Sequence, residues 1–318
     1  MANSNRNTTQ IDNETFPGHL VFAPENLASN ALQAYRQSAW ELAKELSFPA
    51  KKAEDWRWVD LSELDFSELR QPNGSLKAST PAIDQVKALK QGEKAYLGSL
   101  LVSPAGSTRQ IEAEAEQAGV IFTDFKTAER QYPELLAKLA GSVVRPNESK
   151  FAAMASALAE DGVLIYIPQN FQLEKPLLVR LLAGEGSHQA TFTHVLIWVE
   201  AGATADVELA FGSLANENTG QAFHSGIVEI NVGANARLNL TEIQEFGHQV
   251  WNVTHERAKV ERNAHFTWLY GALGSHVSKN FIETDLADSG AEVLVNGFYL
   301  IDDRQLIDLD TQQNHLAA

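Results

Sequence analysis

The chain has 318 residues, of which 44% are hydrophobic, and its formal net charge is −16. This hydrophobic content is ordinary for a globular protein and excludes wholesale disorder, and no stretch approaches the ~18 apolar residues that a membrane-spanning helix needs. The sequence contains no cysteine, so it forms no disulfide and offers no thiolate as a nucleophile or metal ligand.

The negative charge is concentrated in the second half of the chain. Residues 1–150 carry 20 acidic and 17 basic side chains, whereas residues 151–318 carry 21 acidic and 8 basic ones. We interpret the acidic half as a solvated strand face that resists aggregation. Such a surface repels phosphate groups, so we expect no nucleic-acid partner. Residues 1–10 lack the apolar core of a secretory signal, which predicts a cytoplasmic protein without a membrane partner.

The first half of the sequence predicts a largely helical region. Residues 1–20 are polar and predicted to be disordered, and residues 21–160 are predicted to form an α-rich N-terminal domain. Apolar residues fall near helical spacing over Glu25–Leu46, and Pro49 ends this pattern. Pro72–Gly74 predicts a turn. Later helical patterns, the last of them amphipathic, cover Ile111–Ala118, Pro133–Ala140 and Lys150–Glu160.

Residues 161–318 carry the pattern of a β domain. β-branched and aromatic residues alternate with polar ones, which is typical of strands with one covered face. All ten prolines lie at or before Pro176, and a long proline-free stretch suits strands that are paired on both edges. The strand-like stretches are Gly162–Pro168, Leu177–Leu182, Ala190–Phe211, Ala222–Phe246, His248–Tyr270 and Glu292–Leu309.

A weak internal repeat marks the turns of this β domain. Val199–Val207 resembles Ile230–Leu238, and degraded copies follow. Gly and Asn residues, which tolerate positive φ angles, recur at intervals of 31, 30 and 27 residues. These anchors are Gly202, Gly233, Asn263 and Gly290. The repeat predicts a coiled solenoid of strands; an antiparallel sandwich with evenly spaced hairpins is the alternative.

No familiar catalytic or metal-binding motif stands out. The sequence has no P-loop, no GxSxG, no HExxH and no glycine-rich dinucleotide loop. The histidines of the second half match no recognised metal-ligand spacing, so we interpret each as a hydrogen-bonded or solvent-facing group and expect no metal site. These histidines are His224, His248, His255, His265, His276 and His315.

Carboxylates near the end of the chain leave an enzymatic alternative open. Glu283 and Asp285 precede Asp302 and Asp303 by about two rungs of the predicted solenoid, loosely like the paired acids of inverting glycosidases. A β-helical carbohydrate-active enzyme, either a glycosidase or a lyase, is therefore the alternative function. Only Arg304 lies nearby to meet a uronate charge, and the chain shows no secretory signal.

Two tryptophans lie in a short segment of mixed charge that follows Pro49. Trp56 and Trp58 can stack on a ligand, pin a loop as a small satellite core, or belong to a docking surface between domains.

Three passages resemble the SufB/SufD family of iron–sulfur cluster assembly proteins, and its SufD branch most. Lys52–Leu61 (KAEDWRWVDL) is similar to the family signature K-x-E-x-W-R-Y-T-x-L, with Trp58 and Val59 replacing Tyr and Thr. Phe151–Leu177 resembles the family's helix, its G-x-x-I-x-V-P strand and the restart after a proline. Asp308–His315 (DLDTQQNH) is similar to D-x-x-T-x-x-x-H.

This resemblance implies a right-handed parallel β-helix core over residues 161–318 and a non-enzymatic scaffold role. SufD-like proteins pair with SufB, and both bind the ATPase SufC, which holds ATP. The resemblance implies no cofactor on this chain alone and a transient iron–sulfur cluster in the complex. The residues carried over, as structural or docking positions, are Trp56, Arg57, Asp310, Thr311 and His315.

The resemblance also implies that the family domain continues past Ala318. In the family, the following residues close the β-helix, grip SufC and carry a histidine implicated in cluster assembly. We therefore expect a truncated SufD-like chain with weak SufC binding, whose open terminal rung is covered by another subunit or by missing chain.

Overall fold

The computed structural model describes residues 32–50, 53–71, 96–183, 188–213 and 220–317. The disorder predicted for residues 1–20, the helix start at Glu25 and the turn at Pro72–Gly74 lie outside the described residues.

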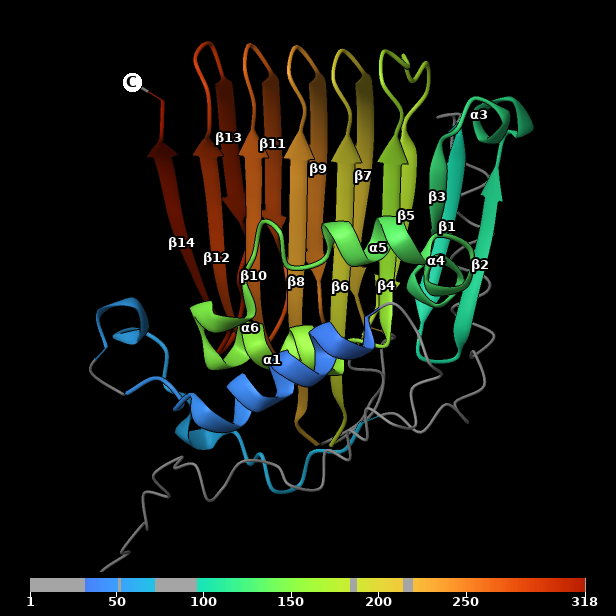
Figure 1. Cartoon of the computed structure of the whole chain (residues 1–318). Helices are drawn as coiled ribbons and strands as arrows, with labels where there is room; N and C mark the ends of the chain where they lie inside the picture. The colour runs from blue at the N-terminus through green and yellow to red at the C-terminus, as the bar shows by residue number, and fades with distance from the viewer. Residues whose placement is uncertain (1–31, 51–52, 72–95, 184–187, 214–219, 318) are drawn as a thin grey trace, which may run out of the picture.

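Most of the described chain forms a β-solenoid of about five turns, in which successive strands alternate between two facing sheets (Figure 1). One sheet has the order β14-β12-β10-β8-β6-β4-β3 and the other the order β13-β11-β9-β7-β5-β1-β2. Strands of successive turns pair in parallel, as where Val250 lies opposite Ala222. The predicted mostly-β solenoid is therefore confirmed, and the antiparallel sandwich is wrong. The right hand of the coil stays a prediction.

Each long strand-like stretch of the sequence divides into two strands, one for each sheet. The solenoid strands are β4 (Asp161–Ile167), β5 (Leu177–Leu182), β6 (Ala190–Val199), β7 (Thr204–Gly212), β8 (Ala222–Val232), β9 (Arg237–Glu245), β10 (Val250–Val260), β11 (His265–Ala272), β12 (Val277–Leu286), β13 (Glu292–Tyr299) and β14 (Leu306–His315). The sequence prediction omitted β12, because Ser278, Lys279 and Asn280 interrupt its apolar alternation.

Three further strands lie in the region that the sequence predicts to be α-rich. They are β1 (Gly98–Ser103), β2 (Gly106–Ile111) and β3 (Ile121–Asp124). β1 pairs in parallel with β5 and forms a hairpin with β2, whereas β3 pairs antiparallel with β4. The helix predicted over Ile111–Ala118 is therefore shorter, since Ile111 belongs to β2 and α3 covers only Ala113–Gln117. Residues 98–124 thus extend both sheets of the solenoid.

Helices cover the outer face of the sheet that contains β6, β8 and β10 (Figure 1). The helices are α1 (Gln33–Glu45), α4 (Phe125–Gln131), α5 (Pro133–Leu139) and α6 (Lys150–Leu158), and the 3-10 turns are η3 (Glu54–Trp56), η4 (Leu61–Glu63) and η5 (Pro146–Glu148). No helix in the described ranges is long and apolar enough to cross a membrane.

α6 is the central helix of this layer. The Ser149 side chain caps it by accepting a hydrogen bond from the backbone N–H of Ala152 at 2.9 Å. The amphipathic character predicted for this helix is wrong, because all nine of its residues are buried. α6 packs against β6, β8 and β10 on one side and against α1 on the other, so it has no solvent face.

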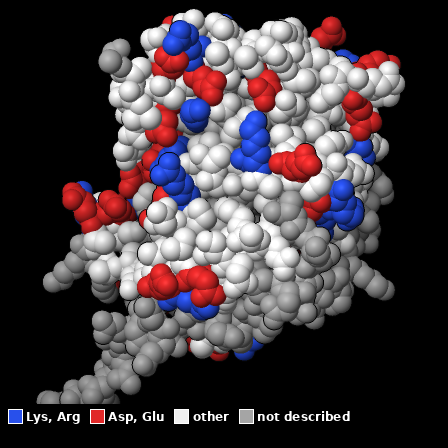
Figure 2. Space-filling model, viewed as in Figure 1, with Lys and Arg blue, Asp and Glu red and all other residues white. Residues whose placement is uncertain are grey.

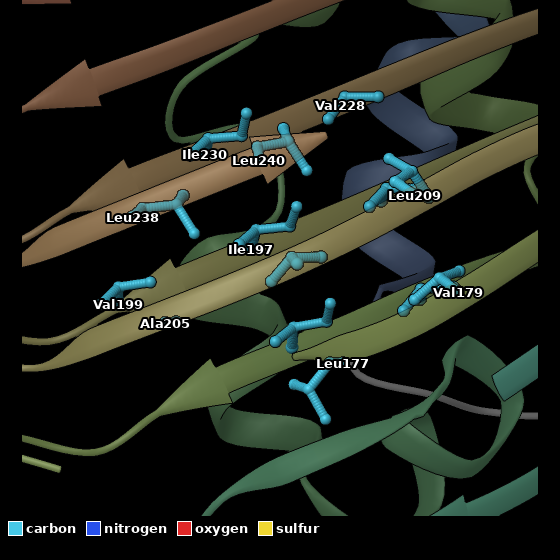
Figure 3. Close-up of a cluster of buried hydrophobic side chains, with 14 of the residues drawn as sticks. Leu177, Val179, Ile197, Val199, Ala205, Leu209, Val228, Ile230, Leu238 and Leu240 are labelled. Atoms are coloured by element: carbon cyan, nitrogen blue, oxygen red, sulfur yellow. The ribbon is translucent and has the colours of Figure 1, made fainter. Parts of the chain in front are cut away.

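The interior between the two sheets is filled by rows of aliphatic side chains from successive turns (Figure 3). Ile197 of β6 lies in the ladder next to Ile230 of β8, and Leu209 and Leu240 come from the facing sheet. Each fully buried side chain of this size contributes roughly 1.5–3 kcal/mol relative to an exposed one. The interior is thus the main source of stability.

A column of residues with positive φ marks one corner of the coil. Its members are Asn170 (φ 60°), Gly202 (φ 70°), Asn235 (φ 57°), Asn263 (φ 53°) and Gly290 (φ 74°). The anchor predicted at Gly233 is wrong, because Asn235 takes the left-handed conformation in that turn. A side chain at Gly290 would be strained, because φ 74° is a backbone conformation that L residues rarely adopt, and its Cβ would also meet Asn263 Oδ1 of the neighbouring turn.

Glu229 of β8 fastens the segment between α5 and η5 to the sheet. Its carboxylate accepts hydrogen bonds from the backbone N–H groups of Gly141 (2.7 Å), Val143 (2.7 Å) and Val144 (3.1 Å). His194 Nε2 lies 2.7 Å from Glu229 Oε1, and both side chains are buried. Four hydrogen-bonding partners thus replace the water that a buried carboxylate loses.

We expect Glu229→Ala to lower the free energy of unfolding by about 3–5 kcal/mol, because it leaves the three N–H groups and His194 without their buried acceptor. Urea denaturation at neutral pH measures this change. Glu229→Gln keeps one oxygen acceptor and should cost less. Glu261→Ala is the control, because Glu261 pairs with Lys259 at the surface; a Glu229→Ala midpoint equal to that of the control would contradict the anchor.

Candidate functional site

Trp56 joins the N-terminal segment to the solenoid. Its side chain is 7% exposed. The indole stacks on Phe151 of α6, with ring centroids 5.3 Å apart and planes at 29°, and lies 5.9 Å from the ring of Phe281 on β12. Trp56 therefore contacts both the helical layer and the outer face of the strands.

Phe281 connects Trp56 to a buried lysine and two aspartates. Lys279 Nζ lies 4.6 Å from the centre of the Phe281 ring, and the lysine side chain is 2% exposed. The ammonium group donates to Asp308 Oδ2 at 3.1 Å and to Asp310 Oδ2 at 3.4 Å. Two carboxylates and an aromatic face thus compensate the buried charge. The first and third family-like passages meet here through Phe281 and Lys279.

A second ionic group lies beside this cluster on the same sheet face. Arg257 of β10 pairs with Glu148 and with Glu283 of β12, each at 2.6 Å. His255 stacks on Phe281 at 4.7 Å, and its Nε2 lies 2.9 Å from Ser149 Oγ. Burial first, and then the charges of Arg257 and Lys279, lower the pKa of His255 to about 3, so its ring is neutral.

The remaining sequence-predicted site residues lie away from this cluster. Arg57 and Trp58 are exposed, and the Arg57 guanidinium lies 4.8 Å from the centre of the Trp58 ring, so Trp56 and Trp58 do not form a stacking pair. Thr311 faces the other way and lines a cavity of about 420 Å³ together with Tyr270. His315 is exposed at the end of β14.

The histidines of the solenoid do not gather at one site. Among the described residues, no group of three or more His, Asp and Glu side chains is placed to hold a metal ion. His248, His265 and His276 lie beside Asp302 (3.6 Å), Glu292 (2.8 Å) and the Trp251 ring (5.0 Å), respectively.

The acids of the enzymatic alternative are not paired. Glu283 is bound to Arg257, and Asp285 accepts a hydrogen bond from Asn314 at 2.8 Å. Both lie near the end of β12, whereas Asp302 and Asp303 precede β14, whose first residue pairs with the start of β12. Six residues of strand, roughly 20 Å, separate Val277 from Glu283. This distance does not fit two acids that flank one glycosidic bond.

Inside the solenoid, a chain of hydrogen-bonded polar side chains crosses the core. The sequence did not predict this chain. It begins at Thr193 and His224, passes through Asn252, and reaches Ser278 and Asn280. Burial lowers the pKa of His224 to about 4, so this histidine is neutral and acts through hydrogen bonds. The other members are Glu242, Gln244, Thr254, Glu256 and Trp268.

On the face that carries α1 and α6, acidic and basic side chains are interspersed (Figure 2). This arrangement fits a surface of local ion pairs such as Lys126–Asp161 (3.3 Å).

Two family models match the chain in order along its length. The model of the SufBD protein N-terminal region matches residues 24–179, and the model of the SUF system FeS cluster assembly SufBD core domain matches residues 181–318. The chain belongs to the SufBD family.

Several curated SufBD proteins match this chain over much of its length. An iron-sulfur cluster assembly SufBD family protein of Staphylococcus epidermidis is 29% identical over 245 residues, which cover 73% of this chain and 52% of the relative. Proteins of the same name from Staphylococcus aureus and Staphylococcus haemolyticus match with the same identity and coverage. The chain thus spans about half the length of the curated relatives it matches.

The junction between the two SufBD family regions falls inside the solenoid. It lies at residues 179–181, within β5, so the N-terminal region of the family contributes β1 to β4 to the two sheets. Membership of the SufBD family supports a role in iron–sulfur cluster assembly within the SUF system.

We expect Trp56→Ala to lower the free energy of unfolding by about 3–5 kcal/mol, because it removes a buried indole from between Phe151 and Phe281. Thermal unfolding measures this loss. Trp58→Ala is the matched control, since Trp58 is 66% exposed and its removal should leave the melting temperature nearly unchanged. Equal melting temperatures for the two variants would show that Trp56 is not an anchor.

Proposed function

We propose that this chain is a non-catalytic scaffold subunit of SUF-type iron–sulfur cluster assembly, of the SufD type. In this proposal it pairs with a SufB-like protein, and the complex serves a SufC-type ATPase that holds the ATP. The observation that supports it best is the ordered match to both regions of the SufBD family over residues 24–179 and 181–318. A cytoplasmic location is part of the proposal.

The metal ligands that this chain can offer support a role in cluster assembly that is shared with a partner protein. Iron–sulfur clusters are held mainly by cysteine thiolates, with histidine as an occasional substitute. The chain has no cysteine. A cluster that it helps to assemble must therefore be ligated largely by the partner, with at most a histidine or carboxylate from this chain across the interface. The absence of a thiol also favours SufD over the partner that accepts sulfur.

We expect the isolated chain to retain no stoichiometric cluster after anaerobic incubation with ferrous iron and sulfide, because it supplies no thiolate ligand. Visible absorbance and iron content after desalting measure retention. A parallel incubation contains a SufB-like protein as well, and cluster absorbance should appear only in that incubation. A cluster that survives desalting on this chain alone would refute the ligand argument.

The partner proposal is tested by co-purification. The tagged chain is expressed with SufB-like and SufC-like proteins, together and one at a time. We expect recovery of the SufB-like protein, and recovery of the ATPase through the complex. Neither partner eluting with the tagged chain, under conditions where the chain itself is folded, would overturn the pairing.

A further inference from the structure

Two glutamates face each other in the interior of the solenoid. Glu242 lies on β9 and Glu256 on β10, so the pair bridges the two facing sheets within one turn, and the side chains are 0% and 1% exposed. No described lysine or arginine reaches them, because Arg257 and Lys259, on the same strand as Glu256, point outward and pair with surface acids.

Each of these carboxyl groups has one oxygen with a donor and one without. Glu242 Oε2 accepts from Trp268 Nε1 at 3.2 Å. Glu256 Oε1 accepts from Thr254 Oγ1 at 2.5 Å and from Gln244 Nε2 at 3.4 Å. Glu242 Oε1 and Glu256 Oε2 are buried without a donor among the described residues.

The two carboxyl groups lie close enough for the charge of Glu256 to raise the pKa of Glu242. Two carboxylate ions buried next to each other repel strongly, and each would also lose the solvation of water. A single proton converts the same contact into a donor and an acceptor.

We propose that Glu242 and Glu256 share one proton at neutral pH, as a carboxylic acid–carboxylate pair that ties β9 to β10 across the core, and that loss of this proton loosens the coil.

The surroundings of the pair support this assignment. Burial, and then the charge of Glu256, raise the pKa of Glu242 well above its ordinary value. Burial raises the pKa of Glu256 to about 7. The other titratable groups that face the interior here are Tyr270 of β11, whose pKa burial raises so that its hydroxyl stays protonated, and His224 of β8, which is neutral. β12 contributes the uncharged Ser278 and Asn280. Within the described part of the chain, the residual negative charge is therefore met by hydrogen bonds and by no lysine or arginine.

The sign of the pH dependence follows from the raised pKa values. The native state holds the proton, whereas an unfolded glutamate releases it near its ordinary value of 4.5. The contribution of the pair to stability is complete below that value. Part of it is lost as pH rises through about 7, where Glu256 ionises and one shared proton remains, and the rest is lost as pH rises through the raised pKa of Glu242. Over this interval the folding equilibrium constant falls by up to about tenfold per pH unit for one proton.

The test combines infrared spectroscopy with unfolding of the full chain between pH 5 and pH 9. We expect the wild type at pH 6 to show the C=O stretch of a buried protonated carboxyl that weakens on the alkaline side, and its melting temperature to fall over the same range. In Glu256→Gln, an amide N–H replaces the shared proton as the donor, so the pH dependence of the melting temperature should be much weaker. Glu261→Gln, at the surface, should keep the wild-type dependence.

A second control isolates Asp161. Burial also raises the pKa of Asp161, so Asp161→Asn reports its share of the infrared band. A band that vanishes entirely in Asp161→Asn would overturn the shared proton, as would its absence from the wild type at pH 6. If Glu256→Gln does not fold, the wild-type and Asp161→Asn spectra decide the question alone. An unchanged pH dependence in a folded Glu256→Gln protein would also overturn it.

Discussion

Parallel pairing between successive turns is the constraint on which the rest of this structure depends. Every strand from β6 to β12 is paired in parallel on both edges with the strands one turn before and one turn after it, so each side chain lies above its counterpart. The offset between paired residues changes from 33 between β6 and β8 to 26 between β10 and β12, yet the ladders stay in register. A shift of one residue would move every interior side chain to the exterior face. The aliphatic rows of the core and the column of positive-φ residues therefore hold the register.

The helical layer is a consequence of that stacked surface. A flat sheet face with buried Phe223 and Trp251 must be covered, and α6 covers it with no solvent face of its own. Glu229 and Trp56 then fix the flanking segments at two separate places, one by charge-assisted hydrogen bonds and the other by aromatic packing. The result is a framework whose helical layer is anchored to the solenoid at two places.

The core combines rows of aliphatic side chains with a chain of hydrogen-bonded polar side chains. Each buried polar side chain must find a partner inside, because water is excluded. The chain from His224 to Asn280 meets this demand with neutral groups, and the glutamate pair meets it with a proton. Polar residues therefore specify which side chains lie next to one another across turns, where aliphatic contacts would tolerate slippage.

The class of fold could be predicted from local patterns, because period-2 alternation, the absence of proline after Pro176 and the recurring Gly and Asn anchors each report local backbone geometry. Family motifs in order along the chain determined the SufBD assignment. Only the tertiary structure decided which residues share a site. Asp310 meets Lys279 and, through Phe281, Trp56, while Thr311 faces the cavity on the other side of the strand. Polar residues of β10 and β12 alternate like solvent-facing ones, and only the register of neighbouring turns reveals that they point inward, since one strand's sequence does not state which of its two faces is covered.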